Sequence, residues 1–428
     1  MVLPVFILYG DGYEGATPEL LGFAMGAYGL SQALFQIPFG AMSDRVGRKP
    51  MIFLGLAIFA LGSILAATSE HIYGVIAGRF LQGAGAIASV IMALLSDLTS
   101  DGSRTKAMAI IGMSIGLSFS LALVLGPIVA EGFGLSGIFW VTAMLALIAG
   151  VWLLIKVPSP THLNRNRDAA LFRDQLSAVL KDSQLMRLDI GIFALHMALT
   201  AIFIAVPLSL VNDAGLAKES HWWVYFLVLV LSFFAMVPFI LIAEKRQKMK
   251  PVFCAAIALL VFSALAMIGL RHSALGFCLA LFLFFMGFNL LEASLPSLVS
   301  KLCPAGGKGT AMGVYSTYQF LGAFCGGVAG GAVLANFGPA GVYILVSVLS
   351  GLWLIIALSM QAPQHQSTMS LNFSNLMDDQ ITLLSRELIS VRGVEDVVVV
   401  PQGAAYLKIL PHELDERALE EVRLRFAT

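Results

Sequence analysis

Charged residues are scarce in this chain of 428 residues, because Asp, Glu, Lys and Arg together make up only 12% of it. A soluble domain carries about a quarter charged residues, so the composition disfavours a soluble globular protein. The two signs also balance, with 26 residues of each. Without a basic excess the chain lacks the electrostatic attraction that draws proteins to nucleic acid, and we expect no nucleic-acid partner.

Cysteine is rare as well, and the four residues (Cys254, Cys278, Cys303 and Cys325) show no CxxC spacing. A disulfide framework and a zinc site are therefore disfavoured. The sequence has no GxxxxGK[ST] phosphate loop, since GGKGT (306–310) lacks the earlier glycine, and no HExxH pair. We expect no enzyme activity, no metal and no cofactor.

Apolar residues are abundant, at 58% of the chain. They form repeated runs of about 20 residues, long enough to cross a bilayer as helices, and predict an all-α membrane protein. The expected spans are 1–11 (partial), 18–43, 50–69, 72–97, 105–131, 136–157, 186–212, 221–243, 251–270, 273–300, 309–336 and 340–361.

Changes of composition divide the chain into four parts. Residues 1–157 and 185–361 are two six-helix bundles, joined by a polar cytoplasmic linker at 158–184, and 369–428 reads as a small soluble domain. The first run reaches Asp11 after only ten residues, about half a membrane span. We therefore expect helix 1 to be truncated.

Basic residues mark one side of the membrane. Loops after even-numbered spans hold seventeen Lys and Arg residues, whereas loops after odd-numbered spans hold only Lys218 and Arg271. Cytoplasmic loops are enriched in these residues, so both termini and the linker are expected in the cytoplasm.

The two bundles also repeat one another. PFGAMSDRVGRKPMIF (38–53) aligns with PFILIAEKRQKMKPVF (238–253), and SRTKAMAIIG (103–112) aligns with GKGTAMGVYS (307–316). Two matches at nearly one offset indicate a duplicated six-helix unit.

Three motifs resemble those of the major facilitator superfamily. GAMSDRVGRK (40–49) resembles its motif between helices 2 and 3, GRFLQGAGA (78–86) its helix 4 motif, and Gly116 through Gly126-Pro127 the helix 5 motif of its drug/proton antiporters. The resemblance covers about residues 1–361. It implies a twelve-span fold, a small-molecule substrate, protons as coupling ion, a monomer and a bacterial inner-membrane location.

The first motif predicts a conformational latch on the cytoplasmic side. A carboxylate is favoured at the positive N-terminus of a helix, and in this superfamily helix 11, here starting near Gly307 and Gly309, lies beside helix 2. Arg48 could reach Asp97 as a bidentate pair, and the glycines permit a tight turn. The latch residues are Gly40, Asp44, Arg45, Gly47, Arg48 and Asp97. For Arg45 and Lys49, the positive-inside bias alone is an equally open explanation.

Ionisable groups inside the spans are costly and point to function. Desolvation in the bilayer favours the uncharged acid at Glu292, so that this residue could take up and release a proton. The proposed proton and substrate pathway comprises Arg79, Gln82, Asn289, Glu292, Gln32, Gln36, Tyr315, Tyr318 and Gln319. Structural polar pairs, or tyrosines packed at a seam between bundles, explain several of these equally well. His196, a lone membrane histidine, is expected to be a core group.

Glycines four residues apart allow helices to approach closely in lipid. Helix 2 carries Gly22 and Gly26, and helix 11 carries Gly322, Gly326 and Gly330 together with Gly327 and Gly331. Pro127 removes one backbone donor and is expected to kink helix 5.

The soluble domain reads as βαββα, a ferredoxin-like unit. Strands are expected at 369–374, 394–401 and 404–411, with a turn at Gln402-Gly403, and helices at 375–391 (Leu376, Leu383, Leu384 and Leu388 inward) and 415–426. Residues 362–428 contain no cysteine, so a soft-metal carrier is disfavoured. A regulatory or docking role and a passive tail both stay open.

The sequence therefore predicts a proton-coupled secondary transporter that exports a small, partly apolar compound. Two alternatives remain: a non-transporting membrane sensor or scaffold that signals through its cytoplasmic domain, and a nutrient symporter.

Overall fold

The structure is a computed structural model that describes residues 2–99, 101–158, 176–303, 308–361, 367–373, 378–400, 404–409 and 413–426. It divides into two compact units. The first comprises Met1–Asn166, Asp189–Glu292 and Ser316–Leu358, and the second comprises Arg167–Leu188, Ala293–Tyr315 and Ser359–Thr428. Most of the expected linker at 158–184 lies outside the described residues.

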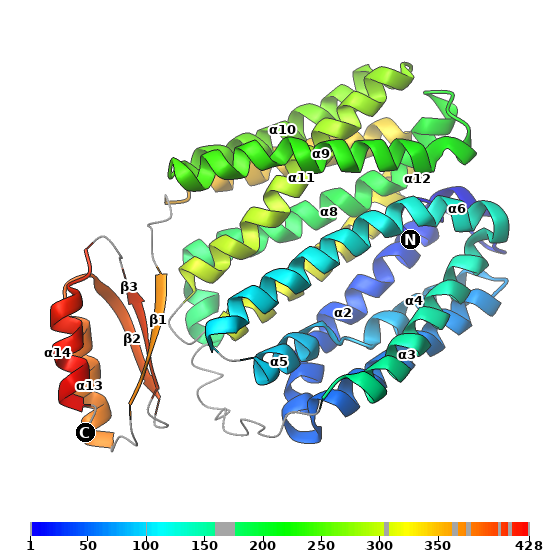
Figure 1. The fold of residues 1–428 in the computed structure, drawn as a ribbon. Coiled ribbons are helices and arrows are strands. Elements are labelled where there is room, and N and C mark those ends of the chain that lie inside the picture. The colour runs from blue at the N-terminus through cyan, green and yellow to red at the C-terminus, as the bar shows by residue number, and fades with distance from the viewer. Residues whose placement is uncertain are drawn as a thin grey trace. The chain divides into compact units, whose positions relative to one another are not determined.

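Long apolar helices make up most of the chain before residue 358 (Figure 1). In the first part of the chain the helical elements are α1 (Phe6–Tyr9), the 3-10 turn η1 (Gly10–Gly12), α2 (Pro18–Val46), α3 (Arg48–Thr68), α4 (Ile72–Ala84), α5 (Ala88–Leu98) and α6 (Asp101–Lys156). In the second part they are α8 (Ser183–Asn212), η2 (Lys218–Ser220), α9 (His221–Lys245), α10 (Met249–Gly269), α11 (Ala274–Leu302) and α12 (Lys308–Leu358).

Two of these helices each contain two of the expected spans. Helix α6 bends at Gly134 (φ 64°, ψ −169°) and α12 bends at Gly338 (φ 65°, ψ −172°). A positive φ is readily adopted only by glycine. Nine helices in the described residues are long and apolar enough to cross a membrane, and counting both bent helices twice gives eleven spans beside the short α1.

The two bends are themselves a repeat. Both fall in the pattern Phe-Gly-x-x-Gly, at residues 133–137 and 337–341, and the spacing equals that between 103–112 and 307–316. Nearly identical dihedral angles at corresponding positions show that the chain turns in the same way at both places. The internal repeat read from the sequence therefore extends to backbone geometry.

Local sequence signals explain several helix ends. The Thr17 side chain accepts a hydrogen bond from the backbone N–H of Leu20, and Pro18 occupies the first turn of α2. Gly47, with φ 109°, separates α2 from α3. The span expected at 72–97 is divided into α4 and α5, because the chain leaves helical geometry at Gly85.

Apolar side chains cover much of the outer surface of the helices. Large examples are Phe133, Trp152, Ile155, Phe234 and Ile355, all more than 60% exposed. A soluble monomer rarely exposes so many large apolar side chains. The chain is an integral membrane protein, and these side chains suit contact with lipid.

The C-terminal domain, part of the second unit, has the expected βαββα order. Its elements are β1 (Ser367–Asn372), α13 (Asp378–Ser390), β2 (Val394–Val400), β3 (Ala404–Ile409) and α14 (Glu416–Phe426). The antiparallel sheet has the order β1-β3-β2, and α13 and α14 cover one of its faces (Figure 1).

The core of this domain confirms most of the expected pattern. Leu384 and Leu388 of α13 are fully buried against Ala405 and Leu407 of β3. The expected inward position of Leu383 is wrong, because this side chain is 52% exposed. Residues 384 and 388 are one helical turn apart and define the buried face, and Leu383 lies beside it. Leu376 and the Gln402-Gly403 turn lie outside the described residues.

Candidate functional site

The charged turn between α2 and α3 is organised around Arg48. Its Nε donates to Asp97 Oδ2 at 2.9 Å, and its Nη1 contacts the Asp44 carboxylate and donates to Ser43 Oγ at 2.6 Å. Only 10% of the Arg48 side chain and 13% of the Asp97 side chain are exposed, against 39% for Asp44. One guanidinium thus joins the ends of α2 and α5, and Asp44 is the carboxylate that remains accessible.

The other residues at this turn, Lys49 among them, have different surroundings. Arg45 is exposed, whereas Lys49 Nζ donates to the backbone carbonyl of Val157 at 2.7 Å. A cation at this carbonyl suits the negative end of α6. A Cβ on Gly40 would lie 3.3 Å from Ser89 Oγ. Sequence reasoning missed the role of Lys49, since no pattern links residues 49 and 157.

The expected contact between Asp44 and the start of α12 stays a prediction. Gly307 lies outside the described residues, and Gly309 belongs to the second compact unit, whereas Asp44 belongs to the first. The described geometry therefore establishes the cluster around Arg48 and leaves the latch itself to be proposed.

A polar cluster inside the first half surrounds Arg79. Its Nη1 donates to Gln82 Oε1 at 2.8 Å, and its guanidinium carbon lies 5.0 Å from the centre of the Tyr28 ring. Gln82 Nε2 in turn donates to Ser63 Oγ at 2.7 Å. The structure brings Arg79 and Gln82 together as their spacing predicts, and adds Tyr28 and Ser63, which sequence reasoning did not select.

Gln32 and Gln36 are both buried in α2. Gln32 Nε2 donates to the Tyr28 hydroxyl at 3.0 Å, which connects it to the Arg79 cluster, whereas Ser89 Oγ donates to the backbone carbonyl of Gln36. The side-chain oxygens of both glutamines are buried without a hydrogen-bond partner among the described residues. These two acceptors could take a hydrogen bond from a ligand or from water.

Three helices meet at Glu292, which lies ten residues before the end of α11, or about 15 Å along the helix. Gln319 Nε2 of α12 is 2.8 Å from His196 Nε2 of α8 and donates to Glu292 Oε1 at 3.4 Å. Glu292 Oε2 is 3.9 Å from His196 Nδ1. Glu292 and Gln319 are thus brought together, and His196, which the sequence suggested was a packing residue, joins them.

The remaining pathway residues are on α11 and α12. Asn289, one turn before Glu292, donates from Nδ2 to Ser232 Oγ of α9 at 3.1 Å. On α12, Tyr315 is buried and Tyr318 is partly buried. Asn289 thus binds the neighbouring helix and does not contact the carboxylate of Glu292.

Glycines bring α12 close to α2 on one side. A Cβ on Gly22 would lie 2.3 Å from the Gly327 carbonyl oxygen, and a Cβ on Gly26 would lie 2.7 Å from that of Phe324. These distances are shorter than any that real Cβ atoms show. The glycine spacing in the two helices therefore corresponds to direct backbone contact.

Other glycines bring α12 equally close to α8. A Cβ on Gly322 would lie 2.2 Å from the Phe193 carbonyl oxygen, and a Cβ on Gly326 would lie 2.3 Å from that of Met197. His196 occupies the same stretch of α8. The close backbone contact explains how Gln319, one turn before Gly322, reaches the ring of His196.

The helix 5 motif lies within α6. Gly126 and Pro127 are buried, and Gly116 is exposed, with nothing within 4 Å of the position of an added Cβ. The helix continues through Pro127, and its backbone leaves helical geometry only at Gly134. Neighbouring helices can compensate for the missing proline donor in a membrane protein. The break in α6 therefore lies at Gly134 and not at Pro127, where the kink was expected.

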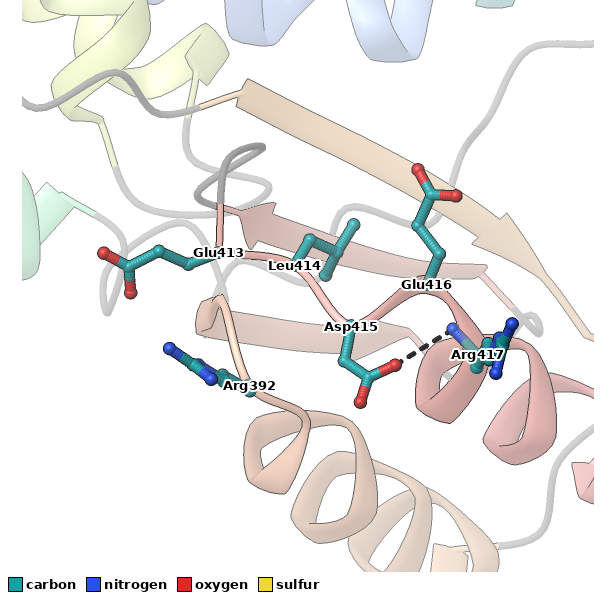
Figure 2. A pocket seen from close by; sticks show the side chains of 6 residues that line it. All are labelled: Arg392, Glu413, Leu414, Asp415, Glu416 and Arg417. Atoms are coloured by element: carbon teal, nitrogen blue, oxygen red, sulfur yellow. Dashed lines mark hydrogen bonds between the residues drawn. The ribbon is translucent and has the colours of Figure 1, made fainter.

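A shallow pocket in the C-terminal domain lies at the start of α14 (Figure 2). Its lining residues are Arg392, Glu413, Leu414, Asp415, Glu416 and Arg417. Asp415 Oδ1 accepts hydrogen bonds from the backbone N–H groups of Arg417 and Ala418, each at 3.1 Å. Asp415 therefore acts as a helix cap, and this local role accounts for its position.

Metal ligands do not gather anywhere in the described ranges, where no three or more His, Cys, Asp or Glu side chains form a group that could hold an ion. The polar contacts of the membrane part instead pair helices with one another through amides, hydroxyls and single ionisable groups. Such an arrangement can bind protons and polar parts of a small molecule.

Comparison with known proteins gives a consistent result. The family model described as Major Facilitator Superfamily matches residues 1–327. The chain is 44% identical over 412 residues to the "Inner membrane transport protein YajR" of Escherichia coli (strain K12), covering 96% of this chain and 90% of the relative. It is also 26% identical over 332 residues to "Multidrug resistance protein 2" of Bacillus subtilis (strain 168), covering 73% of this chain and 79% of that protein.

Among solved structures, the crystal structure of the human organic anion transporter MFSD10 (TETRAN) matches with a TM-score of 0.60 and 23% sequence identity. The match covers 79% of this chain and 84% of that one. At this identity the likeness concerns the fold alone, and it confirms the fold expected from the sequence motifs.

Proposed function

Because the chain belongs to the major facilitator superfamily and is therefore a transporter rather than an enzyme, we propose that it exchanges protons for a small, partly apolar compound. The compound is exported by alternating access of one central site to the two sides of the membrane. The name of one relative, "Multidrug resistance protein 2", supports a drug-like small molecule as the substrate. Lipid and a small-molecule substrate are the partners that the family implies.

The observation that carries the proposal is the position of Glu292. It is an acid well inside a membrane helix, and its carboxylate accepts a hydrogen bond from Gln319 of another helix. An acid in this environment is costly when charged, so binding a proton relieves part of that cost. When deprotonated, the same carboxylate can attract a cationic or hydrogen-bond-donating compound. The proton and the substrate then compete for one binding site.

The proposed conformational cycle uses the cluster at Arg48. Asp44 sits against the positive N-terminal end of α12 while the cytoplasmic side is closed, and it leaves this position when that side opens. A contact between a carboxylate and a helix end is worth about 1 kcal/mol, and up to about 2 when partly buried. Since 1.4 kcal/mol corresponds to a factor of ten, this contact is enough to bias two conformations.

The proposal also states which parts of the protein move, which membrane holds it and how it is oriented there. The two bundles, residues 1–157 and 185–361, move against each other, and the bacterial inner membrane holds the protein with both termini in the cytoplasm. The excess of Lys and Arg in loops on one side supports this orientation, and the name of the Escherichia coli relative supports the membrane. The protein works as a monomer.

The experiment begins with a panel of compounds tested by thermal shift on the purified protein, because a ligand that binds the folded state raises Tm. Uptake of a hit into proteoliposomes is then measured from pH 5 to 9 for the parent and for Glu292→Gln. The parent should depend steeply on pH, and the variant should lose this dependence. An identical pH profile for the two proteins would contradict the assignment of Glu292, and uptake driven in the direction of the proton would indicate symport.

A further inference from the structure

His196 and Glu292 each place one polar side-chain atom near Gln319 and the other polar side-chain atom near each other. One atom of each, His196 Nε2 and Glu292 Oε1, faces the same amide nitrogen of Gln319. The other two, His196 Nδ1 and Glu292 Oε2, face each other at 3.9 Å and are buried without a hydrogen-bond partner in the described part of the chain. A buried donor or acceptor without a partner is unfavourable, and closing this single gap would satisfy both atoms.

The amide of Gln319 determines which ring nitrogen carries the proton. An amide nitrogen can only donate, so Nε2 of His196 accepts the hydrogen bond, and the neutral ring must hold its own proton on Nδ1. This proton points towards Glu292 Oε2. Resting on the proposed proton coupling, we infer that His196, Gln319 and Glu292 form one proton-binding unit, in which Gln319 fixes the tautomer of His196 and His196 positions the Glu292 carboxylate.

The 3.9 Å separation is too long for a hydrogen bond, and it suits the state in which Glu292 carries a proton and both groups are neutral. When that proton leaves, the carboxylate attracts the Nδ1–H of His196, and the gap closes by roughly 1 Å to ordinary hydrogen-bond length. The proton exchanged with the outside is the one on Glu292, and the proton on Nδ1 stays on the ring. His196 is therefore a positioning residue.

Few other groups compete for this carboxylate. Within ion-pair distance of Glu292, the described residues offer only His196. Asn289, on the same helix, donates to Ser232 of α9, and the ring of Phe288 lies against the ring of His196 with centroids 6.0 Å apart. Among the described residues, His196 and Gln319 are therefore the polar side chains that face the carboxyl group of Glu292.

The packing of α12 on α8 keeps the unit assembled. The glycine contacts at Phe193 and Met197 lie three residues before and one residue after His196, and both leave no room for a Cβ. The backbones of α12 and α8 are therefore in direct contact on both sides of His196, which places Gln319 at the ring. The close packing of α12 on α8 at this point argues against an accidental contact between Gln319 and His196.

The first test needs neither substrate nor transport. Nitrogen NMR spectra of ¹⁵N-histidine-labelled full-length protein in lipid nanodiscs report which ring nitrogen is protonated, and His196→Asn identifies the signal by its loss. The parent should show protonated Nδ1 and unprotonated Nε2 at neutral pH, and Gln319→Leu should release this preference. Asn336→Leu, which removes an exposed amide from the same helix, is the control and should leave the signal unchanged. Protonated Nε2 in the parent, or no effect of Gln319→Leu, would overturn the inference.

The second test measures the pH profile of proton-coupled uptake. His196→Leu removes the Nδ1 donor, so that Glu292 keeps its proton to higher pH, and the midpoint should rise by about one pH unit, a tenfold change in proton binding. His196→Asn offers an amide donor near the position of Nδ1 and should restore the parent midpoint. His272→Leu, which alters an exposed loop histidine, should have no effect.

The two proposals fail in different ways. If the parent moves no protons, the proposed function is wrong, whereas the tautomer experiment still decides whether the unit exists. If uptake is proton-coupled but His196→Leu keeps the parent midpoint, the role of His196 is wrong and proton coupling is retained.

Discussion

Replacing Arg48 with alanine should destabilise the protein strongly, because it leaves a buried acid without its partner. The Arg48–Asp97 contact is 2.9 Å long, and both side chains are almost entirely buried. Removing one member of a buried ion pair costs about 3–5 kcal/mol. The contact with Asp44 adds little, since that carboxylate is 39% exposed and exposed pairs contribute up to about 1 kcal/mol. We expect a loss of about 3 kcal/mol.

The measurement is thermal unfolding in detergent micelles, with Arg45→Ala as the matched control. Arg45 is exposed and three residues away, so its loss should change stability by no more than about 0.5 kcal/mol. Arg48→Lys should be intermediate, since an ammonium cannot reproduce the planar fork. Adding Asp97→Asn to Arg48→Ala should restore part of the stability by removing the unpaired charge. Equal Tm values for Arg48→Ala and Arg45→Ala would refute this reasoning.

Two further predictions concern other parts of the molecule. Gly326→Leu places a Cβ 2.3 Å from the Met197 carbonyl oxygen, so overpacking should reduce the free energy of unfolding by about 1–3 kcal/mol and reduce uptake. The control is Gly351→Leu on the same helix, where nothing lies within 4 Å of an added Cβ. Equal Tm losses in the two variants would contradict the prediction. Asp415→Ala removes the cap of α14 and should cost about 1 kcal/mol, seen as faster hydrogen exchange of the first α14 amides in the full-length protein. Asp415→Asn, which keeps an acceptor, should exchange almost as the parent does, and unchanged exchange in the alanine variant would exclude capping.

Much of the fold follows from the sequence because membrane helices must satisfy their own backbone. Long apolar runs then have only one regular solution, and the spans and the βαββα order of the tail could be read directly. The breaks expected between spans 105–131 and 136–157 and between spans 309–336 and 340–361 are confirmed, since the backbone leaves helical geometry at Gly134 and Gly338. Leu383 was misplaced because a short helix allows several neighbouring faces.

The candidate site was predictable only where motif or helical spacing brings residues together. Arg79 and Gln82 are three residues apart on one helix and hydrogen-bonded, whereas His196 and Gln319 are 123 residues apart. No periodicity links positions so distant, and a single histidine in a membrane helix gives no sign of its partner. Lys49 and Val157 show the same limit, because the contact uses a backbone carbonyl that carries no residue-specific signal.

The most direct test of the account is proton movement during transport. Proteoliposomes that contain the protein and an internal pH-sensitive dye are supplied with a transported compound, with no pH gradient imposed at the start. We predict an internal pH change that accompanies transport in the parent and is absent in Glu292→Gln. Transport of the compound by the parent without any movement of protons would contradict the central claim.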